Sequence, residues 1–366
     1  MKRVIKYILP LLALAASCAK PATPGRLPVK LVTDIVSGAD KGGEVIAAAV
    51  NPSSSGEIFI AGSPATAAEY KDKFVSCDIF ENIRGNSWSD GLKDFAGETF
   101  SLISDWANAP YEHFSNTAAG VDSLRELAVR YALAALDTRC NVSVYDLDGN
   151  ARKNSAKIIV LADPWIHEFG LFDVDTLFTL TSCTVPVISP QELLFDEVLG
   201  GEHKSFNIGL ICDSLYLDKG IYGQIFRSKS KSHDVVGTRF FEGSVSGGAG
   251  SLFQFLDEYA EAGNVSPLDA ILVDDPNVDM EELRKDLQAA RDYSREEYFN
   301  YGKFVSPDIC VQNSCDLVMR RCYAILRSGS LFTHRIAQPE FKNYTVSPRP
   351  WAEDMQFLLI PETDDV

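Results

Sequence analysis

The sequence lacks the motifs that mark common hydrolases and zinc sites. It has no HExxH motif and no CxxC spacing, which argues against a zinc protease and a zinc knuckle. No GxSxG elbow is present either. The five histidines show no paired-ligand spacing: His113, His167, His203, His233 and His334. Sequence motifs therefore give little support for catalysis, and we expect no metal and no cofactor.

The cysteines after the N-terminal region cannot all form disulfides with one another. Without Cys18, seven of the eight cysteines remain, and because this number is odd, at least one thiol is free. Most stand in apolar runs, where a buried small hydrophobe is expected. Two-lobed amino-acid racemases use paired cysteines in strand-end loops, but the sequences around Cys77, Cys183 and Cys212 do not resemble those motifs.

Basic charge is scarce: 34 Lys and Arg stand against 51 Asp and Glu, a net charge of −17. Phosphate binding needs a basic footprint, so nucleic acid is excluded as a partner. An acidic surface also disfavours adsorption to anionic lipid. Any attachment to a membrane must then rely on something other than surface charge.

The N-terminus is typical of an export signal. Lys2, Arg3 and Lys6 precede the apolar stretch Tyr7–Ala16 and small residues. This stretch is shorter than the roughly 20 residues of a membrane-spanning helix. Leu14–Cys18 resembles the lipobox of bacterial lipoproteins, in which the cysteine receives diacylglycerol and palmitate and becomes the mature N-terminus. The resemblance implies lipidation at Cys18 and a location in the bacterial cell envelope, anchored to a membrane after export.

The length predicts two lobes, because a chain of this size exceeds a typical single core. We expect a signal peptide over 1–18, a proline-bearing tether over 19–30, a first lobe over 31–200, a second over 201–340 and a C-terminal return segment over 341–366. The boundary between the lobes is placed at the polar, glycine-bearing connection near residue 200.

Short apolar runs alternate with helical patterns, which predicts an α/β fold of two doubly wound lobes with mainly parallel sheets. The predicted strands are Phe100–Ser104, Val142–Leu147, Lys157–Ala162, Val185–Ser189, Phe206–Cys212, Val235–Phe241, Ala270–Val273 and Ile309–Gln312. The predicted helices are Asp122–Leu136, Asp173–Leu180, Gln191–Leu199, Leu252–Ala262, Met280–Arg291 and Asp316–Arg327.

The order of Ala156–Asp163, Val185–Ser189 and Asn207–Asp213 resembles the type I periplasmic-binding-protein fold at its first interlobe crossover, and Asp269–Pro276 resembles a strand of its second lobe. Two short fragments, Leu31–Asp34 and Leu102–Asp105, are also loosely similar to the basic membrane protein family, whose lipid-anchored members bind nucleosides. That family's Asp-Lys-Ser-Phe-Asn signature is not matched, because Lys204–Asn207 leads into a strand. No ligand residue is carried over.

Candidate ligand-binding residues follow the predicted strands, since ligands of open α/β sheets bind at the carboxyl ends of strands. They are Asp105, Trp106, Asn108, Tyr111, Glu112, Asp163, Trp165, Asp213, Ser214, Tyr216, Asp274 and Asp275. Four strands thus deliver an aspartate to one predicted cleft. Each aspartate could instead cap a helix, and the aromatic residues could cover a sheet edge.

These features predict an exported, lipid-anchored solute-binding protein. The ligand would be a small polar molecule, such as a nucleoside, sugar or amino acid, held between the lobes for a membrane transporter or for sensing. Two alternatives stay open. One is an exported hydrolase with a carboxylate-rich site that suits Mg²⁺ or Ca²⁺. The other is a surface protein-contact module with a vestigial cleft.

Overall fold

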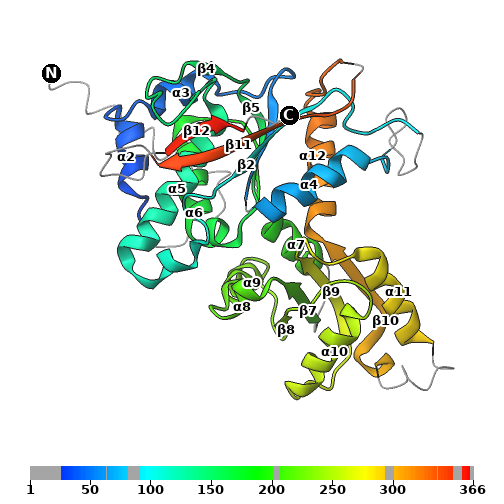
Figure 1. Cartoon of the computed structure of the whole chain (residues 1–366). Helices are drawn as coiled ribbons and strands as arrows, with labels where there is room; N and C mark the ends of the chain where they lie inside the picture. Colours follow the sequence, from blue (N-terminus) through cyan, green and yellow to red (C-terminus); the bar gives the residue numbers. More distant parts are fainter. Residues whose placement is uncertain are drawn as a thin grey trace.

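The computed structural model describes residues 26–62, 64–80, 91–200, 206–292, 301–335, 337–348 and 357–362. The fold is α/β, with two lobes built on mainly parallel sheets (Figure 1). Cys18 and most of the predicted tether lie outside the described residues. No helix among the residues described is long and apolar enough to cross a membrane.

The first lobe is built on a six-stranded sheet in the order β12-β11-β2-β1-β5-β6. Its strands are β1 (Glu57–Gly62), β2 (Thr99–Ser104), β5 (Ala156–Leu161), β6 (Val187–Ile188), β11 (Glu340–Pro348) and β12 (Phe357–Pro361). All neighbours pair in parallel except β11 and β12. The short strands β3 (Arg139–Cys140) and β4 (Ala151–Arg152) form a separate antiparallel pair.

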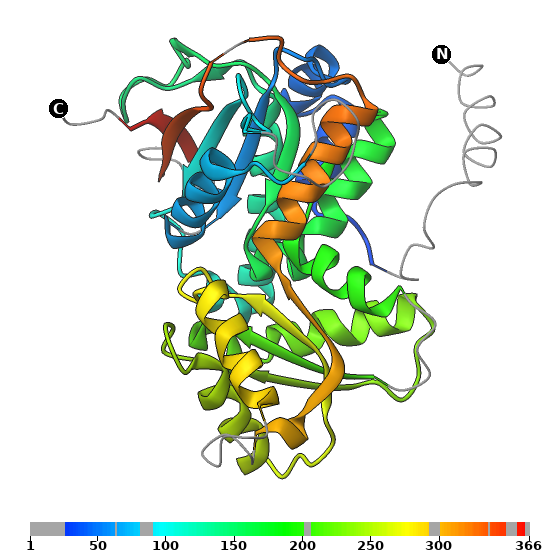
Figure 2. The ribbon, with the colours of Figure 1, turned by 90° about the vertical axis from the view of Figure 1, so that its right-hand side faces the viewer.

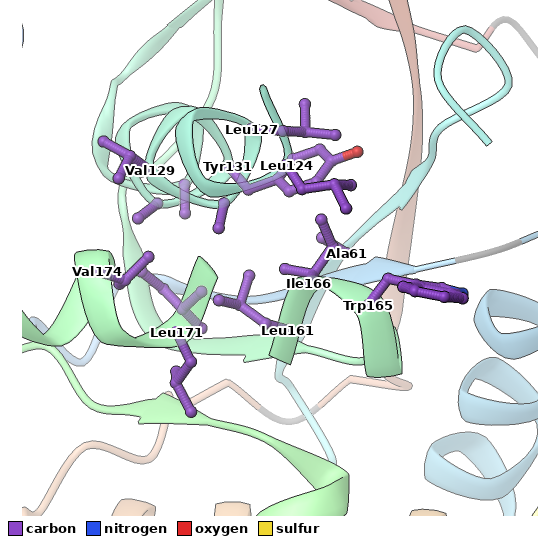
Figure 3. Close-up of a cluster of buried hydrophobic side chains, with 14 of the residues drawn as sticks. Ala61, Leu124, Leu127, Val129, Tyr131, Leu161, Trp165, Ile166, Leu171 and Val174 are labelled. Atoms are coloured by element: carbon purple, nitrogen blue, oxygen red, sulfur yellow. The ribbon is translucent and has the colours of Figure 1, made fainter. Parts of the chain in front are cut away.

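Helices cover both faces of this sheet. The helices α2 (Lys30–Ser37), α3 (Gly42–Ala48), α5 (Ala118–Leu136) and α6 (Pro164–Thr181) share one core with Phe59 and Ala61. The helices α4 (Pro64–Ser76) and α12 (Ser314–Ser328) share another with Ile58 and Ile60. Successive side chains of a strand point to opposite faces, so β1 must be apolar throughout. Figure 3 shows the α5 and α6 side chains meeting Ala61 and Leu161.

The second lobe is built on a four-stranded sheet in the order β10-β9-β7-β8. Its strands are β7 (Asn207–Cys212), β8 (Arg239–Gly243), β9 (Leu268–Asp274) and β10 (Val305–Asn313). The helices α10 (Ser251–Glu261) and α11 (Met280–Arg291) pack on one face. The helix α9 (Ile221–Ser232) packs on the other, and the short α8 (Ser214–Leu217) precedes it.

The chain crosses between the lobes twice. It first passes from α7 (Pro190–Leu199) to β7, and it returns where β10 runs directly into α12, as Figure 2 shows. The apolar face of α12, with Val318 and Cys322, packs in the same core as α4. The predicted second lobe over 201–340 therefore ends too late, because α12 belongs to the first lobe. The predicted return segment over 341–366 supplies β11 and β12 to the first sheet.

One predicted strand is wrong. Residues Val142–Leu147 form turns instead, and the Asp146 side chain accepts hydrogen bonds from the backbone N–H groups of Val142 and Asn150 at 2.9 and 2.8 Å. Val142 and Tyr145 are exposed. An aspartate that binds nearby backbone donors stabilises a turn, and this local interaction outweighs the apolar composition of the segment.

Candidate functional site

A small cavity of about 40 Å³ lies between the two lobes. It is lined from the first lobe by Thr66, Glu69, Tyr70, Ala162, Pro164 and Ser314, and from the second by Asp213, Tyr216, Tyr222, Asp274 and Pro276. Several of these residues follow directly on the carboxyl ends of β5, β7, β9 and β10. The two sheets thus present their carboxyl edges to one shared space, where ligands of α/β folds bind.

Asp163 ties the first lobe to the second. It caps α6, because its Oδ1 accepts hydrogen bonds from the N–H groups of Trp165 and Ile166 at 2.8 and 3.4 Å. Its Oδ2 accepts a hydrogen bond from the hydroxyl of Tyr216 at 3.1 Å. Asp163 is buried. Burial raises its pKa to about 7, although these hydrogen bonds act in the opposite direction and lower the pKa. A large fraction of this carboxyl is therefore protonated at neutral pH.

Asp274 forms the second link between the lobes, from the end of β9. Its Oδ2 accepts hydrogen bonds from the Tyr222 hydroxyl at 2.6 Å and from the Gln191 side-chain amide at 2.9 Å. Ser314 also hydrogen-bonds to it, while burial raises its pKa. Gln191 and Ser314 belong to the first lobe, so this carboxyl is fixed in orientation by both lobes.

Glu69 is a residue of this site that sequence reasoning missed. It lies within α4, hydrogen-bonds to the Asn313 side chain, and lines the cavity opposite the second lobe. Burial raises its pKa to about 7, and the nearby Asp274 adds to the shift. The other candidates were found because they directly follow the end of a predicted strand, and Glu69 does not. The sequence signal that could have identified it is its position in an alanine-rich helix after β1.

The remaining second-lobe candidates lie at the edge of the cavity or just outside it. Asp213 lines it and caps α8, accepting from Leu215 N–H at 2.9 Å, and Ser214 beside it is exposed. Asp275 is buried and accepts from Asn277 N–H at 2.9 Å, so it mainly stabilises the turn after β9. The cap interpretation that the sequence left open applies to Asp213, whereas the following helix α11 is capped by Asp279.

The loop after β2 is a separate hydrogen-bond network. Asp105 is buried and accepts hydrogen bonds from Asn108, from Tyr111 at 3.2 Å and from Tyr131. Trp106 is 68% exposed, Glu112 is partly buried, and none of the five predicted residues of this loop is among those that line the interlobe cavity. Because its acceptors are already occupied by the protein's own groups, Asp105 positions the loop.

Trp165 is likewise a core residue. It is only 3% exposed, and its ring stacks on that of Phe169 with centroids 5.9 Å apart. Only its backbone N–H is linked to the site, because it donates a hydrogen bond to Asp163. The predicted site residues that the structure brings together are therefore Asp163, Asp213, Tyr216 and Asp274, with Asp275 next to them.

Ion pairs and apolar packing hold the lobes together beside the cavity. Lys229 of α9 lies 2.5 Å from Glu192 and 3.2 Å from Asp196 of α7, and His233 lies 2.8 Å from Asp196. Burial raises the pKa of Asp196, but the hydrogen bonds from His233 and Lys229 lower it overall. The buried Tyr222 and Ile225 of α9 belong to the core that also contains α6 and α7.

No cysteine is among the described residues that line this cavity. Cys212 is buried at the end of β7, Cys77 is buried after α4, and Cys183 is partly buried after α6. Burial raises the pKa of all three thiols. Over the described part of the chain, no group of three or more His, Cys, Asp or Glu side chains is arranged to hold a metal ion.

Comparison with known proteins gives a likeness in solved structures only. No protein-family model and no curated protein matches the chain. The glutamate racemase of Francisella tularensis, in complex with D-glutamate, is 12% identical, with a TM-score of 0.46 over 80% of this chain and 89% of that chain. Glutamate racemases of Bacillus anthracis (10% identity, TM-score 0.46, 80% and 89%) and Thermus thermophilus (13%, 0.43, 81% and 89%) are also similar.

These findings correct the prediction of a solute-binding protein, because the three similar structures named above are glutamate racemases. With TM-scores below 0.5, the likeness does not itself assign an activity. The chain's own site is also nearly closed, since the cavity has about the volume of one water molecule. Any function must be argued from the residues around it.

Proposed function

We propose that the interlobe cavity is the active site of an acid–base enzyme that moves a proton on a small polar substrate. The observation that carries this proposal is the convergence of Glu69 from the first lobe and Asp274 from the second on one buried space. Burial raises the pKa of Glu69 to about 7 and raises that of Asp274 as well. Proton transfer is most efficient when the pKa of the catalytic group lies near the working pH.

The two carboxyls have different surroundings, which favours different roles. Asp274 is held in one orientation by Tyr222, Gln191 and Ser314. Glu69 has the Asn313 side chain as its hydrogen-bond partner. Two close carboxyls do not both ionise readily, so one retains a proton while the other is a carboxylate. One can therefore donate a proton to the substrate while the other accepts one.

A donor on one lobe and an acceptor on the other suit an isomerisation in which a proton leaves one face of a carbon atom and another proton arrives on the opposite face. The bond between carbon and the first proton breaks, and its electron pair forms the bond to the second proton. Asp163 does not line the cavity; through Tyr216 it acts as a positioning residue. The proposal concerns carboxyl groups and differs from the cysteine chemistry considered from the sequence.

Substrate entry requires the lobes to separate at the cavity, because about 40 Å³ holds no organic substrate. The hydrogen bonds from Tyr216 to Asp163 and from Gln191 to Asp274 must break for this to happen. The chain crosses between the lobes in two places, between α7 and β7 and between β10 and α12 (Figure 2), and Ser314 at the second crossing lines the cavity. Closure after binding would exclude water from the reacting groups.

Hydrogen exchange at carbon tests the proposal directly. We would incubate the purified protein with pooled amino acids and pooled 2-hydroxy acids in D₂O and follow the loss of each Cα–H signal by NMR. We expect exchange in one substrate class, reduced at least about 100-fold in Glu69→Gln and in Asp274→Asn. Glu261→Gln, an exposed glutamate at the end of α10, is the matched control and should retain the activity.

Equal exchange in Glu69→Gln and in the wild type would overturn the assignment of this residue. Absence of exchange in every substrate of both pools would overturn the proposed reaction. Circular dichroism of each variant separates a loss of catalysis from a loss of the fold.

We also propose that the enzyme is exported and held at the bacterial cell envelope by acylation of Cys18. The support is the order of charged, apolar and small residues before Cys18, together with its resemblance to a lipobox. We further propose that the fold resembles that of type I periplasmic binding proteins. The support is the order of β5, β6 and β7 around the first crossover between the lobes.

A further inference from the structure

A second and larger cavity lies on the first lobe, and among the described residues it shares no lining residue with the interlobe site. Its volume is about 1050 Å³, at the upper end of the roughly 300–1,000 Å³ typical of small-molecule sites. Its described walls are residues 91–94 and 96, the C-terminal half of α12, and residues 330, 332, 334, 335, 337 and 338, which follow α12.

The walls combine an apolar surface with basic groups. Tyr323 and Phe332 supply aromatic rings in edge-to-face contact, with centroids 5.4 Å apart. Lys93, Arg327 and Arg335 supply three cations, whereas Asp94 is the one acid among the described lining residues. This local excess of positive charge occurs in a chain with a net charge of −17. An organic anion with an apolar body matches such a surface.

Asp94 contributes a polar group that the protein itself leaves unsatisfied. The residue is only 3% exposed. Its Oδ2 accepts hydrogen bonds from the N–H groups of Ile79 and Phe80 at 2.7 and 3.0 Å and from the thiol of Cys77 at 3.3 Å. Its Oδ1 is buried and has no hydrogen-bond partner in the described structure. A buried acceptor without a partner is costly, and a ligand hydroxyl or N–H group would satisfy it once a small movement of the cavity wall exposes this oxygen.

The backbone around the cavity is held by a close approach at Gly97. Its N–H donates to the Ala337 carbonyl at 2.7 Å, and its φ of +79° suits glycine. A Cβ atom at this position would lie only 2.1 Å from the carbonyl oxygen of Arg335. Glycine thus allows the segment after α12 to lie against the segment before β2, and this contact fixes two walls of the cavity relative to each other.

We infer that this cavity binds a small amphipathic organic anion with an apolar or aromatic body and a hydrogen-bond donor. The anionic group pairs with Arg327 and Arg335, the body packs against Tyr323 and Phe332, and the donor bonds to Asp94. The inference does not depend on the proposed function, because the cavity is separate from the interlobe site.

The fluorescent probe 8-anilinonaphthalene-1-sulfonate tests the inference, since it has a sulfonate, apolar rings and one N–H donor. We expect saturable binding to the folded protein at a single site. Arg327→Gln and Arg335→Gln should each weaken it by about tenfold or more. Both arginines are exposed, so neither substitution removes core packing. Arg321→Gln is the matched control on the same helix, because Arg321 is exposed and does not line the cavity.

Displacement of the probe separates charge recognition from simple apolar binding. We expect 4-hydroxyphenylacetate to displace it, whereas tyramine, with the same ring and hydroxyl but an ammonium group, should not. Equal displacement by both compounds, or binding unaffected by Arg327→Gln and Arg335→Gln, would overturn the inference. Isomerase activity measured on the same arginine variants should be unchanged, which distinguishes this site from the interlobe one.

Discussion

At the scale of single residues, Asp163 shows how one buried carboxyl can both support a helix and respond to pH. Its Oδ1 caps α6, its Oδ2 accepts from Tyr216 of the other lobe, and burial raises its pKa to about 7. A carboxyl with a raised pKa binds its proton more tightly in the folded state than in the unfolded state. Its contribution therefore stabilises the fold in acid and is lost as the pH rises towards 7.

We predict that Asp163→Asn flattens the pH dependence of stability. In the wild type, this residue makes the free energy of unfolding fall between about pH 4 and pH 7, by up to about 1.4 kcal/mol per pH unit. The asparagine can still cap α6 but cannot titrate. Urea unfolding at several pH values measures the slope. Glu69→Gln should flatten it further, since Glu69 has the same direction of shift; an unchanged slope in both variants would contradict the prediction.

Sequence reasoning identified Asp163 and Asp274 but could not separate them from Asp105. All three follow parallel strands, so the strand-end rule treats them alike. What distinguishes Asp105 is Tyr131, a partner on α5 that occupies its carboxylate. Glu69 escaped notice because it reaches the cavity from within a helix. Contacts between residues far apart in the chain decided each case.

At the scale of secondary-structure elements, the closest helix contact is that of α5 with α6. Gly170 of α6 faces Ala128 of α5, and a Cβ atom at residue 170 would lie only 2.2 Å from the Cβ of Ala128. The missing side chain lets the two helices approach, and their apolar residues then fill the space above the sheet (Figure 3). Close packing of this kind leaves no room for an added methyl group.

We predict that Gly170→Ala destabilises the protein by about 1–3 kcal/mol, because the added methyl forces α5 and α6 apart. Gly223→Ala is the matched control within α9. Its added Cβ would meet its nearest neighbours, Arg227 and Glu242, at 3.5 and 3.6 Å, an ordinary contact distance. Alanine favours helix, so this variant should be unchanged or up to about 1 kcal/mol more stable. Thermal unfolding of both variants checks the difference, and a stable Gly170→Ala protein would refute the close-packing argument.

The sequence predicted strands most reliably where both faces of the strand are buried. β5, β7 and β9 are continuous apolar runs, and the structure places strands there. α9 went unpredicted because its last four residues, Lys229–Ser232, are polar and rich in serine and lysine. The Lys229 ammonium nevertheless pairs with Glu192 and Asp196 across the lobes. A tertiary ion pair of this kind leaves no periodic signal in the sequence.

At the scale of the whole molecule, the proposed lipidation of Cys18 would determine where the protein works. We predict that the wild-type chain expressed in a bacterium incorporates labelled palmitate and fractionates with membranes, while Cys18→Ser does neither. The reason is that several acyl chains anchor a protein stably, whereas the acidic body has little affinity for anionic lipid. Cys310→Ser is the control and should retain both properties. Labelling that persists in Cys18→Ser would reject acylation at this residue.

The number of lobes followed from chain length, but their boundaries did not. The prediction divided the chain into consecutive segments, whereas the first lobe takes α12, β11 and β12 from the C-terminal end. Pairing of Glu340 with Thr99 is a contact between distant residues, and the local sequence of either strand does not reveal it. Continuity along the chain was therefore the wrong assumption.

This discontinuity sets an order for folding as the chain emerges from its N-terminus to its C-terminus. The second lobe is one uninterrupted segment, from β7 to β10, and it has its own core. The first lobe lacks β11 until nearly the last residues have emerged, and β11 joins directly to β2. During N-to-C translocation, the second lobe can fold while β2 still has an unpaired edge, a state prone to aggregation. The proposed export would therefore make the protein depend on envelope chaperones most strongly just before its translocation is complete.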